Sequence, residues 1–175
     1  MFYLKEEEEL LALCASPIAT KNRVGRIEEL VRDPYVDINC VDHNGNNALL
    51  LLCRMNRCGD LYSCVKVLLR GNQSDDEDKR IDINHQNAQG WNALLLLCRY
   101  HTDENLIDLF RLLIQQGINL RIKTIHNWNV LLLLSRHYNN ENLLDIARLY
   151  LNYNKDYINC QTDYGSNCLS LLCRY

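Results

Sequence analysis

Leucine-rich blocks recur along the chain, and a polar stretch precedes most of them. The block NALLLLCR occupies residues 47–54 and recurs unchanged at 92–99. It returns as NVLLLLSR at 129–136 and as NCLSLLCR at 167–174, and a diverged copy, EELLALCA, lies at 8–15. The aligned Cys or Ser falls at positions 14, 53, 98, 135 and 173, at intervals of 39, 45, 37 and 38 residues. Such spacing predicts repeats of one supersecondary unit.

Each full repeat has two further parts. A polar element, DINCVDHNG at 37–45 and DINHQNAQG at 82–90, comes before the leucine block, with later versions at 119–127 and 157–165. An amphipathic stretch follows the blocks at 60–71, 105–117 and 142–154, with apolar residues at the i, i+3, i+4 spacing of one helix face. The predicted unit is therefore a turn, a short apolar helix, a loop and a longer amphipathic helix.

Asparagine and glycine mark the predicted turns. An asparagine opens each leucine block where a helix N-cap belongs, because its side chain accepts a hydrogen bond from an orphan backbone N–H. The N-cap residues are Asn47, Asn92, Asn129 and Asn167, and the turn residues expected at positive φ are Gly45, Gly90, Gly165 and, as the tolerated side chain, Asn127.

One helix pair cannot bury its own leucines, whereas stacked neighbours can. The sequence therefore predicts an all-α repeat solenoid, a stack of helix pairs linked by β-turn or hairpin loops. It forms a single domain over 1–175, with repeats at about 1–35, 36–80, 81–117 and 118–155 and a partial repeat at 156–175.

The chain resembles the ankyrin-repeat family, whose unit is a β-turn and two helices marked by T-P-L-H-x-A. Here Asn47, Ala48, Leu49 and Leu50 replace Thr-Pro-Leu-His, and the DIN element resembles the family's Asp-Val-Asn. The period of 37–38 exceeds the family's 33, and we expect the extra residues between the helices, at 100–104 and 137–140. A polar, acidic insert at 72–79 reads as a solvated loop, with docking of a partner as the minor alternative.

Charge and composition argue against some classes of function and location. The 175 residues carry 19 basic and 22 acidic side chains, a net charge of −3, which argues against binding nucleic acid or an anionic membrane through bulk charge. The acidic residues 6–9 lie where a signal peptide needs positive charge, so we expect an intracellular protein, cytoplasmic or alternatively nuclear. The nine cysteines are then expected as reduced thiols.

No catalytic motif is present, so we expect no enzyme, no catalytic residue and no cofactor. The cysteines lack paired C-x-x-C spacing, and Ser135 replaces the cysteine of the leucine block, so we expect small buried side chains and no metal site. Cys58 is the expected reactive thiol. A redox or metal sensor using Cys58, Cys64 and the C-terminal cysteines remains an alternative.

The resemblance implies a protein-binding scaffold that uses the turn tips and the concave face of the first helices. Trp91 and Trp128 directly follow their turns, which predicts either binding hot spots or rings that lie flat across the neighbouring turn and stabilise the stack. Arg54, Arg99, Arg136 and Arg174 form a column that either complements helix C-termini or holds acidic groups. The other candidate contacts are His43, Asn44, Asn46, Gln89, Tyr100, Ile125, His126, His137 and Tyr164.

The sequence therefore predicts a non-catalytic protein-interaction scaffold whose partner it does not identify. The chain stops soon after its last leucine block, which leaves Leu169, Leu171 and Leu172 without a covering second helix. Either the natural protein continues, or this edge binds a partner. Self-association through the C-terminal edge is thus a second hypothesis for the function.

Overall fold

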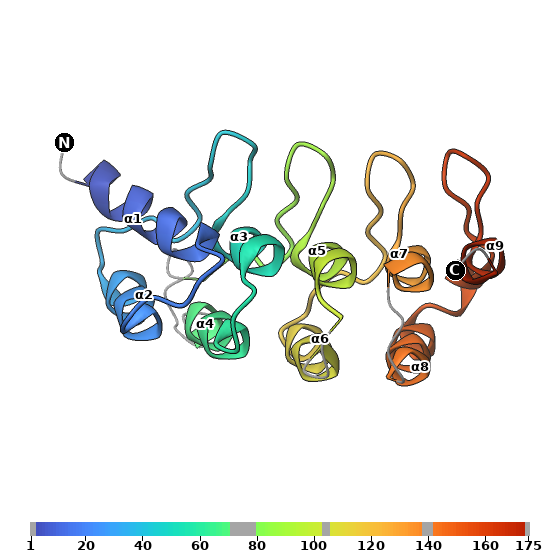
Figure 1. Ribbon diagram of the computed structural model, residues 1–175. Coiled ribbons are helices and arrows are strands. Elements are labelled where there is room, and N and C mark those ends of the chain that lie inside the picture. The colour runs from blue at the N-terminus through green and yellow to red at the C-terminus, as the bar shows by residue number, and fades with distance from the viewer. Residues whose placement is uncertain (1–2, 71–79, 103–105, 138–141, 174–175) are drawn as a thin grey trace. The chain divides into compact units, whose positions relative to one another are not determined.

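The computed structural model describes residues 3–70, 80–102, 106–137 and 142–173, and its helices appear in chain order in Figure 1. By their internal contacts the residues divide into two compact units, Met1–Asn87 and Ala88–Tyr175. Within the described ranges the regular structure is helical, apart from an isolated antiparallel bridge between Gln161 and Asn167. The prediction of an all-α chain is confirmed to that extent.

The first unit contains two helix pairs. Helices α1 (Tyr3–Ala15) and α2 (Arg23–Arg32) form one pair, and α3 (Ala48–Met55) and α4 (Leu61–Leu68) form the next. Helix α1 packs on α3, and α2 packs on α4, so the pairs lie side by side (Figure 1). All six residues from 48 to 53 are buried, because α3 has neighbours on more than one side within this unit.

The second unit repeats the arrangement. Helices α5 (Ala93–Tyr100), α7 (Val130–His137) and α9 (Cys168–Leu172) pack in a row, α5 on α7 and α7 on α9. Helices α6 (Leu106–Gln115) and α8 (Leu143–Tyr153) form the second layer, and the 3₁₀ helix η3 (Lys155–Asn159) follows α8. The turns that precede α7 and α9 project on the side away from α6 and α8 (Figure 1).

The predicted N-caps are confirmed in all four repeats. The Oδ1 atoms of Asn47, Asn92 and Asn129 accept hydrogen bonds at 2.9–3.0 Å from the backbone N–H three residues on. Asn167 accepts one from Ser170 at 2.8 Å, and the Ser170 hydroxyl completes a capping box. The caps also reach the following repeat, because Asn47 Nδ2 donates to the Asp82 carbonyl at 3.3 Å and Asn92 Nδ2 to that of Asn119 at 3.5 Å.

The predicted turn conformations are confirmed as well. Gly45, Gly90 and Gly165 have φ of 75°, 75° and 73°, and Asn127 occupies the same position with φ of 59°. Asparagine is the side chain that best tolerates this region after glycine, because its short amide bonds locally to the backbone. The turn therefore keeps its shape where the glycine is replaced.

The aligned Cys or Ser of the leucine blocks is buried, as predicted, in every repeat except the last. Cys14, Cys53 and Cys98 are fully buried, and Ser135 fits the same position by donating from Oγ to the Leu131 carbonyl at 2.8 Å. Cys173 is exposed, so the prediction of a buried cysteine is wrong there. Among the described helices of the second unit, α7 is the main packing neighbour of α9.

The prediction that the leucines of the last block lack a covering helix is confirmed for two of the three. The exposed fractions of Leu169 and Leu172 are 70% and 49%, whereas Leu171 is 1% exposed in the helix that packs against α7. The acidic insert at 72–79 and parts of the two inter-helix loops, 103–105 and 138–141, lie outside the described residues. No helix in the described part of the chain has the length and apolar character needed to cross a membrane.

Candidate binding surface

The turns are built from short side-chain-to-backbone hydrogen bonds. In the first, Asp42 Oδ1 accepts from the backbone N–H groups of Asn44 and Asn46, both at 2.8 Å. In a later turn the Thr124 hydroxyl accepts from those of His126 and Trp128 at 3.3 and 3.2 Å. A side chain two residues before the tip thus holds both of these turns, in the manner of Asx and ST turns.

Consecutive turns of the second unit are joined by backbone hydrogen bonds. The Ile125 N–H donates to the Gln89 carbonyl at 3.2 Å, and the Asp163 N–H donates to that of His126 at 3.4 Å. Asn127 Nδ2 adds a bond to the Asp163 carboxylate at 2.6 Å. These bonds restrain the tips relative to one another within the unit.

The tips carry exposed side chains that differ between repeats. The exposed fractions of Ile125 and Tyr164 are 61% and 81%. The side chains of Gln89 and His126 are also exposed, and His126 lies 3.5 Å from the Asp163 carboxylate. In the first unit His43 and Asn44 are exposed and hydrogen-bonded to each other at 2.9 Å. These predicted contact residues are accessible.

Asn46 is not accessible, and its prediction as a contact residue is wrong. Its side chain is fully buried. The amide donates to the Asp42 carboxylate at 2.9 Å and accepts from Asn87 Nδ2 at 2.8 Å. The position after the turn glycine therefore has a structural role in this repeat, because Asn46 connects its own turn to the next element of the first unit.

The two tryptophans occupy that position in the second unit, and each contacts an arginine of its own repeat. The Arg99 guanidinium carbon lies 5.2 Å from the centroid of the Trp91 ring, and that of Arg136 lies 5.3 Å from the centroid of Trp128. Both rings are half-buried and both arginines are exposed. These are cation–π pairs between the residue before the N-cap and the last turn of the same short helix.

Tyr100 and His137 extend the two arginine–tryptophan pairs. The Tyr100 ring centroid lies 5.5 Å from the Arg99 guanidinium, so this guanidinium contacts two aromatic rings. Partial burial, together with repulsion by Arg99 and Arg136, lowers the pKa of the His137 imidazole below its ordinary 6.5. We call Trp91, Arg99, Trp128, Arg136 and His137 the arginine–tryptophan cluster.

The rest of the predicted arginine column does not form this arrangement in the described residues. Arg54 is half-buried, and its repeat carries the buried Asn46 where the next two repeats carry Trp91 and Trp128. Arg174 lies outside the described residues. The cation–π geometry therefore distinguishes Arg99 and Arg136 from a column that is uniform in sequence.

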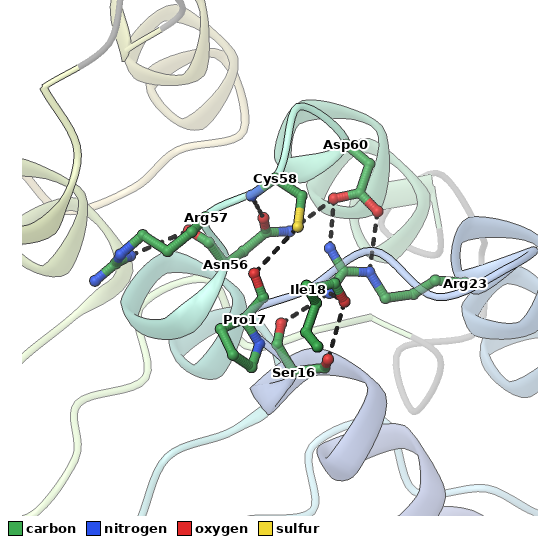
Figure 2. Close-up of polar contacts among 8 residues, drawn as sticks. All are labelled: Ser16, Pro17, Ile18, Arg23, Asn56, Arg57, Cys58 and Asp60. Carbon is green, nitrogen blue, oxygen red and sulfur yellow. Dashed lines mark hydrogen bonds and ion pairs between the residues drawn. The ribbon is translucent and has the colours of Figure 1, made fainter.

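A second polar cluster lies in the first unit and is structural in character (Figure 2). Arg23 is 1% exposed and forms an ion pair with Asp60, whose Oδ2 atom accepts from Arg23 Nε at 3.0 Å. Arg23 also donates to the Ser16 carbonyl at 2.8 Å, and Asn56 donates to Asp60 at 3.0 Å. Burial raises the pKa of Asp60, but the bonds from Arg23 and Asn56 outweigh it and leave the pKa below its ordinary value.

Cys58 belongs to the same cluster. Its backbone N–H donates to Asn56 Oδ1 at 2.7 Å, and its Sγ lies 3.1 Å from the Pro17 carbonyl (Figure 2). The thiol is half-buried, so Cys173 is more accessible than the predicted reactive Cys58. No group of three or more His, Cys, Asp or Glu side chains suited to a metal ion occurs among the residues that the structure describes.

No protein-family model matches this chain, and no curated protein matches it either.

The arginine–tryptophan pairing was missed by sequence reasoning, although a signal was present. Residues 91 and 99, and again 128 and 136, combine Trp and Arg at the same separation in two consecutive repeats. The separation spans an N-cap and a two-turn helix and lies outside the i, i+3 and i+4 spacings at which helix side chains are expected to meet. The hydrogen bonds from the Asn47 and Asn92 side chains to carbonyls of the following repeat were also missed, because they join residues far apart in the sequence.

Proposed function

We propose that this chain is an ankyrin-like helical solenoid that binds another protein without catalysis, through its turn tips and its short first helices. The observation that carries the proposal is the set of exposed, differing side chains on hydrogen-bonded turns, above all Ile125 and Tyr164, at 61% and 81% exposed. A surface restrained before binding loses little conformational entropy on association. The recurrence of one helix pair supports the solenoid, because stacked repeats bury leucines that a single pair leaves exposed.

The mechanism is the presentation of a preorganised surface. Backbone bonds hold the tips, while residues that differ between repeats supply the contacts. Large side chains such as Ile125 and Tyr164 provide apolar area for a partner, and half-buried Trp91 and Trp128 are the residue type most enriched at binding hot spots. We propose a role in the cytoplasm or nucleus for this scaffold.

Site-specific photocrosslinking tests the proposal. A photoreactive phenylalanine analogue is placed at 125 or 164, or at 144 or 153 on α8, where Leu144 and Tyr153 are 65% and 56% exposed. We expect crosslinks to one and the same protein from both tip positions in cells that make the chain, and none from the α8 positions. Equal crosslinking from α8, or no crosslinking from the tips, would contradict the proposal.

Binding measurements with the captured protein then give the energetic test. Tyr164→Ala is expected to weaken binding about tenfold or more, the loss typical of a hot-spot aromatic residue. Tyr153→Ala removes the same side chain from α8 and is expected to leave the affinity unchanged. Trp91→Ala and Trp128→Ala are expected to weaken binding with little change in melting temperature. A large loss of stability with binding intact would instead favour a stacking role for the tryptophans.

Self-association is a second candidate function, favoured by the exposed Leu169 and Leu172 of α9. Their exposed fractions of 70% and 49% are high for leucine. Sedimentation velocity over a range of concentrations tests this function with the 175-residue chain and with Leu169→Glu. A dimer that the glutamate abolishes would support it, and a monomer at every concentration would exclude it.

A further inference from the structure

Arg99 and Arg136 are exposed, and their guanidinium carbons lie over tryptophan rings at 5.2 and 5.3 Å from the ring centroids. Neither forms an ion pair with a carboxylate in the part of the chain that the structure describes. Other arginines there do, among them Arg23, Arg26, Arg32, Arg70, Arg111 and Arg148. Arg99 and Arg136 therefore combine an exposed guanidinium, a tryptophan ring beneath it and no carboxylate partner among the described residues.

Stacking leaves the hydrogen-bonding capacity of a guanidinium intact. Its five N–H groups point outward in the plane of the group, and a cation–π contact uses none of them as a hydrogen-bond donor to a carboxylate. The neighbouring indole therefore restricts the motion of the guanidinium and leaves its donors available. A guanidinium held in this way loses less rotational freedom when it forms the two parallel bonds of a carboxylate pair.

The two guanidinium groups influence the same side chain, that of His137. Both lie close enough to His137 to disfavour its protonation, and His137 is itself half-buried at the end of α7. Trp91 and Trp128 hold equivalent positions in consecutive repeats, and α5 packs directly on α7. The cluster therefore concentrates positive charge on one surface of the second unit, and this charge favours binding of carboxylates.

We propose that the arginine–tryptophan cluster binds an acidic segment of the protein partner, with one Asp or Glu carboxylate on Arg99 and another on Arg136. This inference rests on the proposed function and adds the chemistry of the partner. Single-stranded nucleic acid is the main competing ligand, because it combines phosphates with bases that stack on aromatic rings. The cluster fits it less well, since each indole already contacts its own arginine and is less available to stack on a base.

The chain's own tryptophans report binding at this site. Trp91 and Trp128 are the two tryptophans of the whole sequence, so the intrinsic tryptophan fluorescence comes entirely from the cluster. The probe is a ten-residue polyglutamate peptide, with polyglutamine of the same length as the uncharged control. We expect saturable fluorescence changes with polyglutamate, weaker binding at higher salt, and no change with polyglutamine.

Matched arginine variants test whether the cluster itself binds the peptide. Arg99→Gln and Arg136→Gln are each expected to weaken polyglutamate binding about tenfold, the cost of losing a charge-assisted bond pair. Arg148→Gln removes the same charge from α8, where Arg148 pairs with Asp145, and is expected to change affinity less than twofold. Arg99→Lys keeps the charge but not the planar fork, and we expect a loss close to that of Arg99→Gln.

Three results would overturn the inference: no fluorescence change with polyglutamate, an equal loss in Arg148→Gln, or tighter binding of a ten-residue oligothymidylate than of polyglutamate. Circular dichroism of each variant shows that any loss does not come from unfolding. Failure here is distinct from failure of the proposed function. A partner crosslinked at 125 and 164 that binds Arg99→Gln as tightly as the parent chain would retain the scaffold role and reject the acidic segment.

Discussion

The backbone N–H of Ile125 lies 3.2 Å from the carbonyl oxygen of Gln89, so the tips of two consecutive turns are hydrogen-bonded directly. The glycine that follows Gln89 makes this approach possible. Gly90 has φ of 75°, and a Cβ placed there would lie 3.2 Å from the backbone nitrogen of Ile125 and from the Cα of Thr124. The glycine is therefore required twice, for its backbone conformation and for the space that it leaves.

Gly90→Ala is expected to destabilise the protein more than Gly165→Ala. Both changes put a side chain at positive φ, which costs about 1–2 kcal/mol, but nothing lies within 4 Å of a Cβ at 165, where φ is 73°. The difference between their free energies of unfolding in urea isolates the contact between the tips. Equal losses would mean that the tips can separate without cost.

Removing either partner of the buried Arg23–Asp60 pair is expected to be strongly destabilising. Asp60→Asn leaves the almost fully buried guanidinium without a counter-charge, and such changes cost about 3 kcal/mol or more. The double variant Arg23→Met with Asp60→Leu is expected to be more stable than Asp60→Asn, because no unpaired charge remains. Urea denaturation of the three chains measures this, and a double variant less stable than Asp60→Asn would contradict it.

The same pair predicts sensitivity to acid. The pKa of Asp60 lies below its ordinary 3.8 in the folded protein, so the folded state binds the proton less readily than the unfolded chain. Its contribution to stability is present above that ordinary value and is lost as the pH falls through the folded pKa. Asp60→Asn should therefore lose less stability than the parent chain between pH 5 and about pH 2. Parallel loss curves would contradict this.

Tyr150 is fully buried, and its hydroxyl has no hydrogen-bond partner among the described residues. Tyr150→Phe removes an unsatisfied polar group and keeps the ring, so we expect a gain of about 1 kcal/mol in the free energy of unfolding. Tyr157→Phe is the matched control, because the Tyr157 hydroxyl donates to the Arg121 carbonyl at 3.0 Å, and we expect a loss of about 0.5–1 kcal/mol. Thermal and urea denaturation measure both, and a loss in Tyr150→Phe would contradict the assignment.

His137 is expected to titrate below 6.5, since partial burial and then the charges of Arg99 and Arg136 disfavour its protonation. Below the unfolded pKa the unfolded chain binds more protons than the folded one, so stability falls as the pH falls from about 7 to 5. NMR titration of the His137 ring measures the pKa, which Arg99→Gln should raise and Arg148→Gln should leave unchanged. An ordinary pKa in the parent chain would mean that the two arginines lie too far from the ring.

The cysteines are expected to react in order of exposure. Burial raises the pKa of the Cys14, Cys53 and Cys98 thiols, and all three are fully buried. A short pulse of iodoacetamide followed by mass spectrometry should label Cys173 first and Cys58 more slowly, and the three buried thiols only after unfolding. Rapid labelling of Cys53 in the folded protein would show that α3 opens readily.

The helices, caps and turns could be predicted from the sequence because each follows from local rules. Repeated apolar spacing marks the helices, an asparagine before each leucine block caps it, and a glycine or Asn127 supplies positive φ. Comparing four copies of one segment made these signals clear, since positions common to all copies have a shared structural cause. The exposed tips, including Ile125 and Tyr164, followed from the same pattern.

Contacts between residues far apart in the chain were decided only by the tertiary structure. Asn46 is buried because Asn87 bonds to it across 41 residues, and Arg23 is buried because Asp60 lies beside it after 37. Trp91 and Arg99 lie near opposite ends of a two-turn helix, and local spacing rules do not predict their contact. Periodicity fixes which face of a helix is apolar, but the partner of a polar side chain depends on how separate elements pack.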